Sequence, residues 1–179
     1  MRTLLIQNGQ LLSPVNGYRG EKKDILIRDG KIAEIEDSIS AEGVSVVDAS
    51  GCYVTPGFID IHTHCYPKAF LGLEPDVLGL KRGATTILDA GSSGADNYED
   101  FRRNFIDKSR TKVFTLLNVS KEGLIRGHEL DSMDKLDEAA LKKTLEQYKD
   151  NIVGLKARAS ASVVGQMGLT PIAEAAALA

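Results

Sequence analysis

The sequence predicts an α/β protein in which a small β-rich segment, residues 1–54, precedes alternating strands and helices in residues 55–179. Two observations support this prediction. Short β-prone runs separated by Gly, Pro and Asn turns fill the first segment. After Pro56-Gly57, apolar runs of strand length alternate with stretches of helical period. Such alternation favours a parallel sheet covered by helices.

In residues 1–54, the dipeptide Asp29-Gly30 is the clearest local signal. It separates two β-prone runs, residues 24–28 and 31–36, and it suits the two central positions of a type I′ hairpin turn. Asn8-Gly9 predicts a second tight turn between short strands. Roughly 50 residues of such strands form only a thin core, so we expect this segment to pack on another part of the protein.

The rest of the chain contains four strand-like runs and four helix-like stretches. The expected strands are residues 58–64, 84–89, 112–119 and 152–156, and the expected helices are residues 75–82, 97–108, 136–149 and 171–179. Pro75 suits the first turn of its helix, and Gly83 suits the position just past the end. Leu141, Leu145 and Tyr148 form one apolar stripe at helical spacing.

This number of strands is half of what a closed barrel needs. An eight-stranded (β/α)8 barrel takes about 250 residues. We therefore interpret the sequence as truncated, with the first half of a TIM-type barrel in residues 55–179. A complete four-stranded open α/β sheet is the structural alternative.

Composition excludes several classes of protein. The 179 residues are 42% hydrophobic and carry a formal charge of −3, with no basic stripe for nucleic acid. No apolar run reaches the ~18 residues of a membrane span, and the N-terminus does not resemble a signal peptide. We predict a cytoplasmic protein with a small-molecule substrate, reduced Cys52 and Cys65, and no nucleic-acid or membrane partner. A homo-oligomer remains open.

We expect the functional site at the end of the strand at residues 58–64. His62 and His64 are two positions apart, so their side chains project from the same face of that strand. Two imidazoles on one face can bind one cation. By itself, a His-x-His pair on a β-run is incidental about as often as it is ligating.

The stretch from Val54 to His64 closely resembles the first-strand signature of the amidohydrolase superfamily. Residues 24–32 and 46–51 resemble the β-sandwich that flanks the barrel in that superfamily. The resemblance implies the N-terminal half of a TIM-type (β/α)8 metallohydrolase barrel, preceded by a small β-sandwich segment. It covers essentially the whole chain.

Gly154-Leu155-Lys156 resembles the fourth strand of binuclear members, in which a carboxylated lysine bridges two metal ions. The resemblance thus implies a metal site with His62, His64 and Lys156 as ligands, most simply two zinc ions. Iron, manganese or nickel suit the same ligands. It also implies two further histidines and a proton-shuttling aspartate from later strands. These are absent, so we expect an incomplete catalytic site and assign no catalytic residue.

Five neighbouring side chains have weaker interpretations. Asp60 is expected to orient an imidazole rather than to serve as a further metal ligand. Cys65 is expected to pack as a small residue rather than to touch metal, and His128 to lie on a surface loop rather than to contact substrate. Arg158 and Ser160 share a strand face with Lys156, where they either reach a substrate carboxylate or face solvent. Asp89 and the loop at residues 91–94 are expected at the same rim, and they are assigned no role.

The expected function is metal-dependent hydrolysis of a C–N bond in an amide or cyclic amide, by a metal-bridged hydroxide, as in deacetylases and dihydroorotases. Two other hypotheses remain open. One is a catalytically inactive metal-binding scaffold or partner subunit with the same fold. The other is a metal-free α/β binding module.

Overall fold

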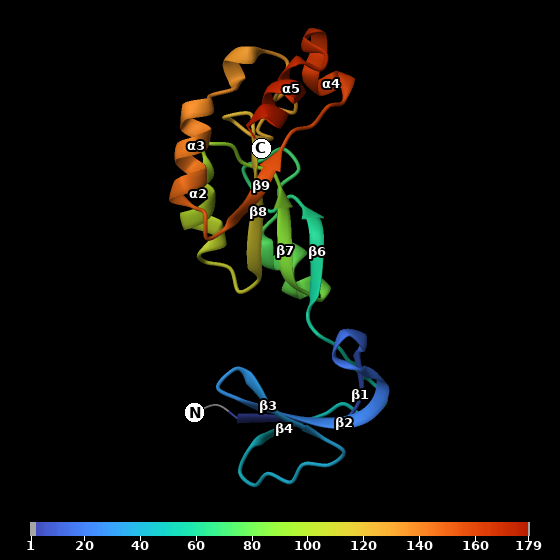
Figure 1. The fold of residues 1–179 in the computed structure, drawn as a ribbon. Helices are drawn as coiled ribbons and strands as arrows, with labels where there is room; N and C mark the ends of the chain where they lie inside the picture. Colours follow the sequence, from blue (N-terminus) through green and yellow to red (C-terminus); the bar gives the residue numbers. More distant parts are fainter. Residues whose placement is uncertain (1–2, 179) are drawn as a thin grey trace. The chain divides into compact units, whose positions relative to one another are not determined.

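The computed structural model describes residues 3–178, and the chain divides into two compact units, Met1–Pro56 and Gly57–Ala179. The first unit is a mixed sheet of five strands in the order β3-β2-β1-β4, with β5 also paired to β1 (Figure 1). Its strands are β1 (Thr3–Ser13), β2 (Tyr18–Arg28), β3 (Lys31–Glu36), β4 (Ser45–Asp48) and β5 (Tyr53–Val54). β4 and β5 run parallel to β1, so this unit is not the simple meander that the sequence suggested.

The hairpin predicted at Asp29-Gly30 is confirmed. Both residues have positive φ, 50° and 76°, as a type I′ turn requires, and Arg28 pairs with Lys31. The turn predicted at Asn8-Gly9 is wrong. There the chain stays within β1 and forms a bulge, because β1 is paired with β2 on one side and with β4 and β5 on the other.

The core of the first unit is small, with Leu5, Leu26 and Ile39 as its buried cluster. Isoleucines of β1, β2 and β3 line an open groove of about 600 Å³ within this unit. A small core beside a large apolar groove agrees with the thin core expected of so few short strands.

The second unit is built on a parallel sheet with the strand order β6-β7-β8-β9. Its strands are β6 (Phe58–Thr63), β7 (Ala84–Ala90), β8 (Lys112–Asn118) and β9 (Ile152–Lys156). Its α-helices are α1 (Pro75–Leu78), α2 (Tyr98–Phe101), α3 (Glu138–Gln147), α4 (Ala161–Val164) and α5 (Thr170–Ala177). The parallel sheet predicted from strand and helix alternation is therefore confirmed.

Helices α2 and α3 lie along one side of this sheet, and α4 and α5 lie beyond the end of β9 (Figure 1). The main apolar cluster contains Tyr98 and Phe101 of α2, Leu141 of α3 and Leu117 of β8. α2 continues as a π-helix over Arg102–Ile106, so the expected helix at 97–108 is correct in place but mixed in type. The expected end of the last helix, Ala179, lies outside the described residues.

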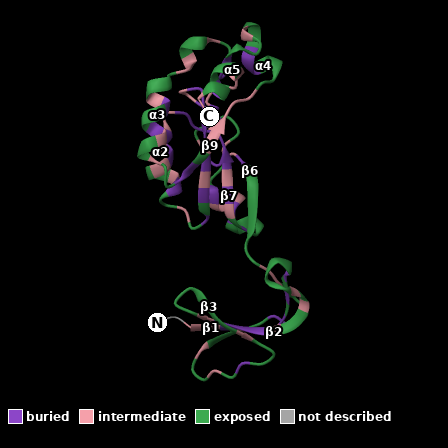
Figure 2. Ribbon diagram, viewed as in Figure 1, coloured by how far each residue is buried: buried purple, intermediate pink, exposed green. Residues whose placement is uncertain are grey.

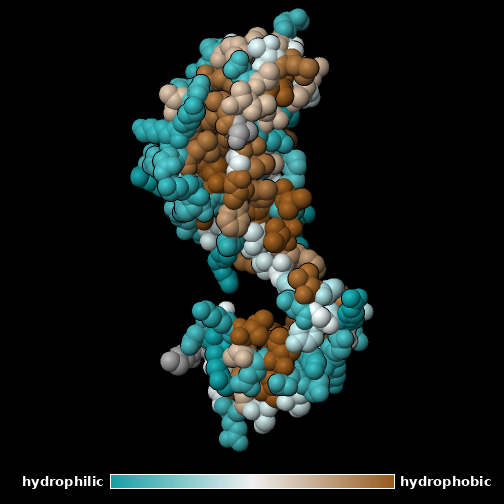
Figure 3. Space-filling view, viewed as in Figure 1, coloured by the Kyte–Doolittle hydropathy of each residue, from teal (hydrophilic) through white to brown (hydrophobic). Residues whose placement is uncertain are grey.

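Strand β6 is much more exposed than its neighbour β7 (Figure 2). Phe58, Ile59 and Ile61 of β6 are 65%, 64% and 73% exposed, and apolar side chains are visible on the surface of this unit (Figure 3). β6 and β9 each pair on one side only, as the outer strands of this sheet. Within residues 3–178, no helix has the length and apolarity needed to cross a membrane.

Candidate metal centre

The three predicted ligands all lie at the C-terminal edge of the parallel sheet. His62 is near the end of β6, His64 follows that strand directly, and Lys156 is the last residue of β9. The imidazole rings of His62 and His64 are 5.6 Å apart between centroids, at an interplanar angle of 83°. Parallel strands thus bring residues almost 100 positions apart in sequence to one edge, where (β/α)8 enzymes build their active sites.

His64 is held by the loop that follows β7. Its Nδ1 atom lies 3.0 Å from Oγ of Ser92, and that hydroxyl donates to Oδ2 of Asp89 at 2.7 Å. Asp89 and Ser92 are both completely buried. Asp89 also accepts the backbone N–H groups of Cys65 and Ser92, each at 2.7 Å. The end of β7 therefore fixes the histidine at the end of β6.

The same loop lies against Lys156. Gly91 has a φ of +80°, and a Cβ atom there would come within 2.5 Å of Lys156 Cβ. The carbonyl of Gly91 accepts a 2.9 Å hydrogen bond from Asn118, which is the strand partner of Lys156 in β8. Only glycine fits at position 91 without moving the lysine.

The surroundings of His64 favour its neutral form. Burial lowers the pKa of His64 below its ordinary value, and the positive charges of Lys156 and Arg158 act in the same direction. Asp89 opposes this shift. Burial in turn raises the pKa of Asp89, against the hydrogen bonds from Ser92 and Cys65. A neutral imidazole is the form that binds a metal ion.

The residues fit a divalent metal ion in their chemistry. His64 uses Nδ1 for Ser92 and so has Nε2 available as a ligand, and a second imidazole is adjacent. Within residues 3–178, no three His, Cys, Asp or Glu side chains gather closely enough to bind a metal. The predicted set is of another kind, since it has two histidines and a lysine.

Asp60 and Cys65 differ in how they match expectation. Oδ1 of Asp60 accepts the backbone N–H of His62 at 3.1 Å. The hydrogen bond to the His64 ring comes from Ser92 and not from Asp60. Cys65 is fully buried, and burial raises the pKa of its thiol, as suits a packing residue. His128 is exposed on a loop, as expected, with Nδ1 2.8 Å from the carbonyl of Ser162.

Arg158 forms a two-pronged ion pair with Glu129. Nε and Nη2 of Arg158 donate to the two carboxylate oxygens of Glu129, both at 2.9 Å. The Glu129 side chain is 1% exposed and that of Arg158 is 33% exposed. The pair therefore ties the loop after β8 to the loop after β9, beside Lys156. Ser160 has a different place, since it precedes α4 as its N-cap residue.

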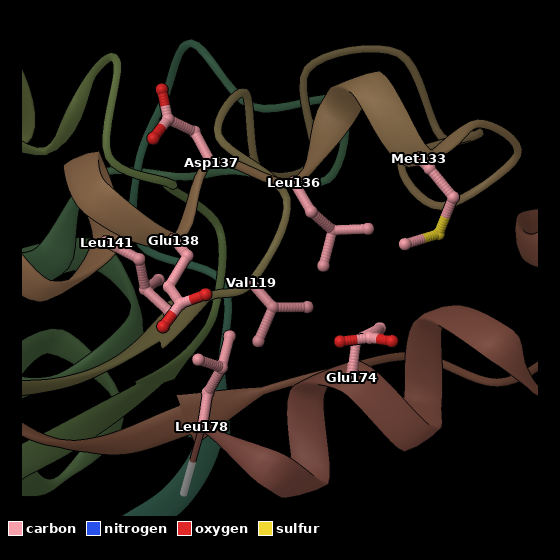
Figure 4. Close-up of a pocket in the computed structure, with 8 residues that line it drawn as sticks. All are labelled: Val119, Met133, Leu136, Asp137, Glu138, Leu141, Glu174 and Leu178. Carbon is pink, nitrogen blue, oxygen red and sulfur yellow. The ribbon is translucent and has the colours of Figure 1, made fainter.

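A separate cavity of about 180 Å³ lies between α3, α5 and the loop before α3 (Figure 4). Val119, Leu136 and Leu141 give it an apolar lining, and the carboxylates of Glu138 and Glu174 point toward it. None of the predicted metal ligands lines this cavity.

Sequence reasoning missed Asp89 and Ser92. The signal was present, because an Asp at a strand end followed three residues later by Ser is a pattern that caps its own turn. The sequence placed this turn at the same rim as His64, but it did not reveal that Ser92 would contact the His64 ring, 28 positions away.

Comparison with known proteins finds relatives that share the sequence and the fold of this chain. A deacetylase of Enterococcus faecalis is 39% identical over 171 residues, which is 94% of this chain and 44% of that protein. A dihydroorotase crystal structure superposes with a TM-score of 0.92 at 30% identity, covering 100% of this chain and 48% of the other. The chain matches the N-terminal portion of proteins of the amidohydrolase superfamily. An adenine deaminase structure with TM-score 0.85 and 37% identity covers 99% of this chain and 47% of its own.

These amidohydrolase relatives also define the fold class. β6, β7, β8 and β9 correspond to the first half of a TIM-type barrel, as predicted from the sequence. The chain spans less than half the length of the proteins it matches here. No family model matches the chain.

Proposed function

We propose that the protein is a metal-dependent amidohydrolase that cleaves a C–N bond of an amide or cyclic amide, with His62, His64 and Lys156 as the metal ligands from this half of the barrel. The observation that supports the proposal is the position of all three residues at the C-terminal ends of parallel strands, in a chain similar to a deacetylase and a dihydroorotase. A pair of divalent ions, zinc in the first instance, lowers the pKa of water and polarises a substrate carbonyl.

The residues of this chain prepare the site in three ways. Asp89 and Ser92 hold His64 through Nδ1, and burial lowers the pKa of His64, which favours the neutral ring. Gly91 leaves space for the Lys156 side chain, which would supply oxygen ligands to the metal site if it were carboxylated. The Arg158 and Glu129 pair anchors the loop after β8 to the loop after β9.

The test is metal content together with hydrolysis by the full-length protein. We expect about two metal ions per chain and activity on N-acyl amino acids or cyclic amides. His62→Ala, His64→Ala and Lys156→Ala should each lose metal and activity. Activity of Lys156→Ala should recover in part with added short-chain carboxylic acids, which replace the carbamate oxygens.

Two other outcomes distinguish the remaining hypotheses. Stoichiometric metal without hydrolysis of any amide or cyclic amide would favour an inactive metal-binding scaffold or partner subunit. A full-length protein without bound metal, and with no gain in stability on adding zinc, would favour a metal-free α/β module.

A further inference from the structure

The loop after β7 contacts His64 through one side chain, Ser92. Both the Oγ of Ser92 and the carboxylate of Asp89 are completely buried, so no solvent competes for their hydrogen bonds. Two hydrogen bonds, 3.0 Å from Ser92 to His64 and 2.7 Å from Ser92 to Asp89, join the three side chains in one series. Which group donates in each of these hydrogen bonds decides which nitrogen of His64 carries the proton.

The direction follows from the hydrogen-bonding capacity of Asp89. Oδ1 accepts the backbone N–H of Ser92, and Oδ2 accepts the backbone N–H of Cys65. With a backbone donor fixed on each oxygen, Asp89 is arranged as an acceptor, and the Ser92 hydroxyl donates to Oδ2 at 2.7 Å. Ser92 has a single hydroxyl hydrogen, which this contact uses.

Ser92 Oγ must therefore act as an acceptor toward His64. The hydrogen of the neutral imidazole then lies on Nδ1, and the lone pair lies on Nε2. We propose that Ser92, oriented by Asp89, is a positioning residue that fixes the tautomer and ring orientation of His64 so that Nε2 faces the metal site. This inference rests on the proposed function for the identity of the ligand, but the tautomer itself can be tested without metal.

The chain supplies a matched control in the adjacent residue. Ser93 is 1% exposed, in the same loop, and its hydroxyl has no hydrogen-bond partner within the described residues. Ser92→Ala and Ser93→Ala thus each remove one buried hydroxyl from this loop. Of the two, Ser92→Ala alone removes a hydrogen bond to His64.

The first experiment measures the zinc affinity of the full-length protein by competition with a chelator. Loss of an outer partner of a metal-bound histidine typically weakens metal binding about 10- to 100-fold. We expect a loss of that size for Ser92→Ala and an unchanged affinity for Ser93→Ala. Equal affinities of the two variants would overturn the proposal. An absence of zinc binding in the unmodified protein would instead overturn the proposed function.

The second experiment measures the tautomer of His64 without any substitution in the loop after β7. Long-range 1H–15N correlation spectra of the metal-free, 15N-histidine-labelled protein, recorded above the pKa of His64, report the protonated ring nitrogen. The His64 signals are assigned by their loss in His64→Asn. We expect the Nδ1–H form for His64, and the Nε2–H form would overturn the proposal even if Ser92→Ala failed to fold.

Discussion

The backbone of Gly91 lies directly against the side chain of Lys156. A Cβ atom on Gly91 would lie 2.5 Å from Cβ and 2.6 Å from Cγ of the lysine, well inside van der Waals contact. Lys156 ends β9 while Gly91 follows β7, so this contact spans two strands that are not neighbours in the sheet. Lys156 can therefore occupy its position because residue 91 is a glycine and has no side chain.

Gly91→Ala should displace Lys156 and lower metal content and activity. Gly83→Ala is the matched control, because Gly83 has a similar φ of +88° and a Cβ atom added there would have no neighbouring atom within 4 Å. Both variants should lose about 1 kcal/mol of stability from the positive φ. Equal metal content in the two variants, measured by elemental analysis, would show that Lys156 does not depend on Gly91.

We expect the two single variants of the Arg158 and Glu129 pair to lose different amounts of stability. Arg158→Ala leaves a carboxylate that is only 1% exposed without its partner, whereas Glu129→Ala leaves a guanidinium that is 33% exposed and can bind water. Removing one partner of a buried pair costs about 3–5 kcal/mol. We expect Arg158→Ala to approach that range and Glu129→Ala to fall below it.

Urea unfolding of both variants of the full-length protein measures the difference. The double variant should be less destabilised than the sum of the two, because neither charge is then left alone. A larger loss in Glu129→Ala than in Arg158→Ala would contradict the burial argument.

We expect the ion pair of Asp100 to make the protein less stable in acid. The Lys68 ammonium, 2.7 Å away, and the Tyr66 hydroxyl lower the pKa of Asp100 to about 2. A carboxyl group whose pKa is lower in the folded state stabilises the protein above its unfolded pKa. This contribution should therefore be lost as the pH falls from about 4 towards about 2.

Asp100→Asn should remove that part of the pH dependence, and Lys68→Met should reduce it because the ammonium that pairs with the carboxylate is gone. Urea unfolding between pH 2 and pH 6 provides the measurement. An acid dependence that is the same in Asp100→Asn and the unmodified protein would rule out this assignment.

A fragment of residues 1–179 expressed alone should self-associate. β6 is an outer strand with Phe58, Ile59 and Ile61 largely exposed, and unpaired strand edges with apolar side chains favour aggregation. Light scattering against concentration gives the answer. A monomeric fragment with a single cooperative unfolding transition would contradict the prediction.

The sequence by itself determined the order of elements and the ends of strands at which chemistry was expected. Hydrophobic period and turn residues are local properties, so the four parallel strands and the Asp29-Gly30 hairpin followed from short stretches. The ligand candidates His62, His64 and Lys156 came from motif and strand position. The bulge at Asn8 was missed because pairing on both sides of β1 overrode a local turn signal.

Only the tertiary structure decided how those side chains are held. Ser92 contacts His64 and Gly91 contacts Lys156 because parallel pairing brings the loop after β7 to the edge where β6 and β9 also end. Likewise, Arg158 pairs with Glu129, 29 positions away, across two loops. Contacts between residues distant in sequence depend on strand order and register, and no local pattern encodes those for a single pair of side chains.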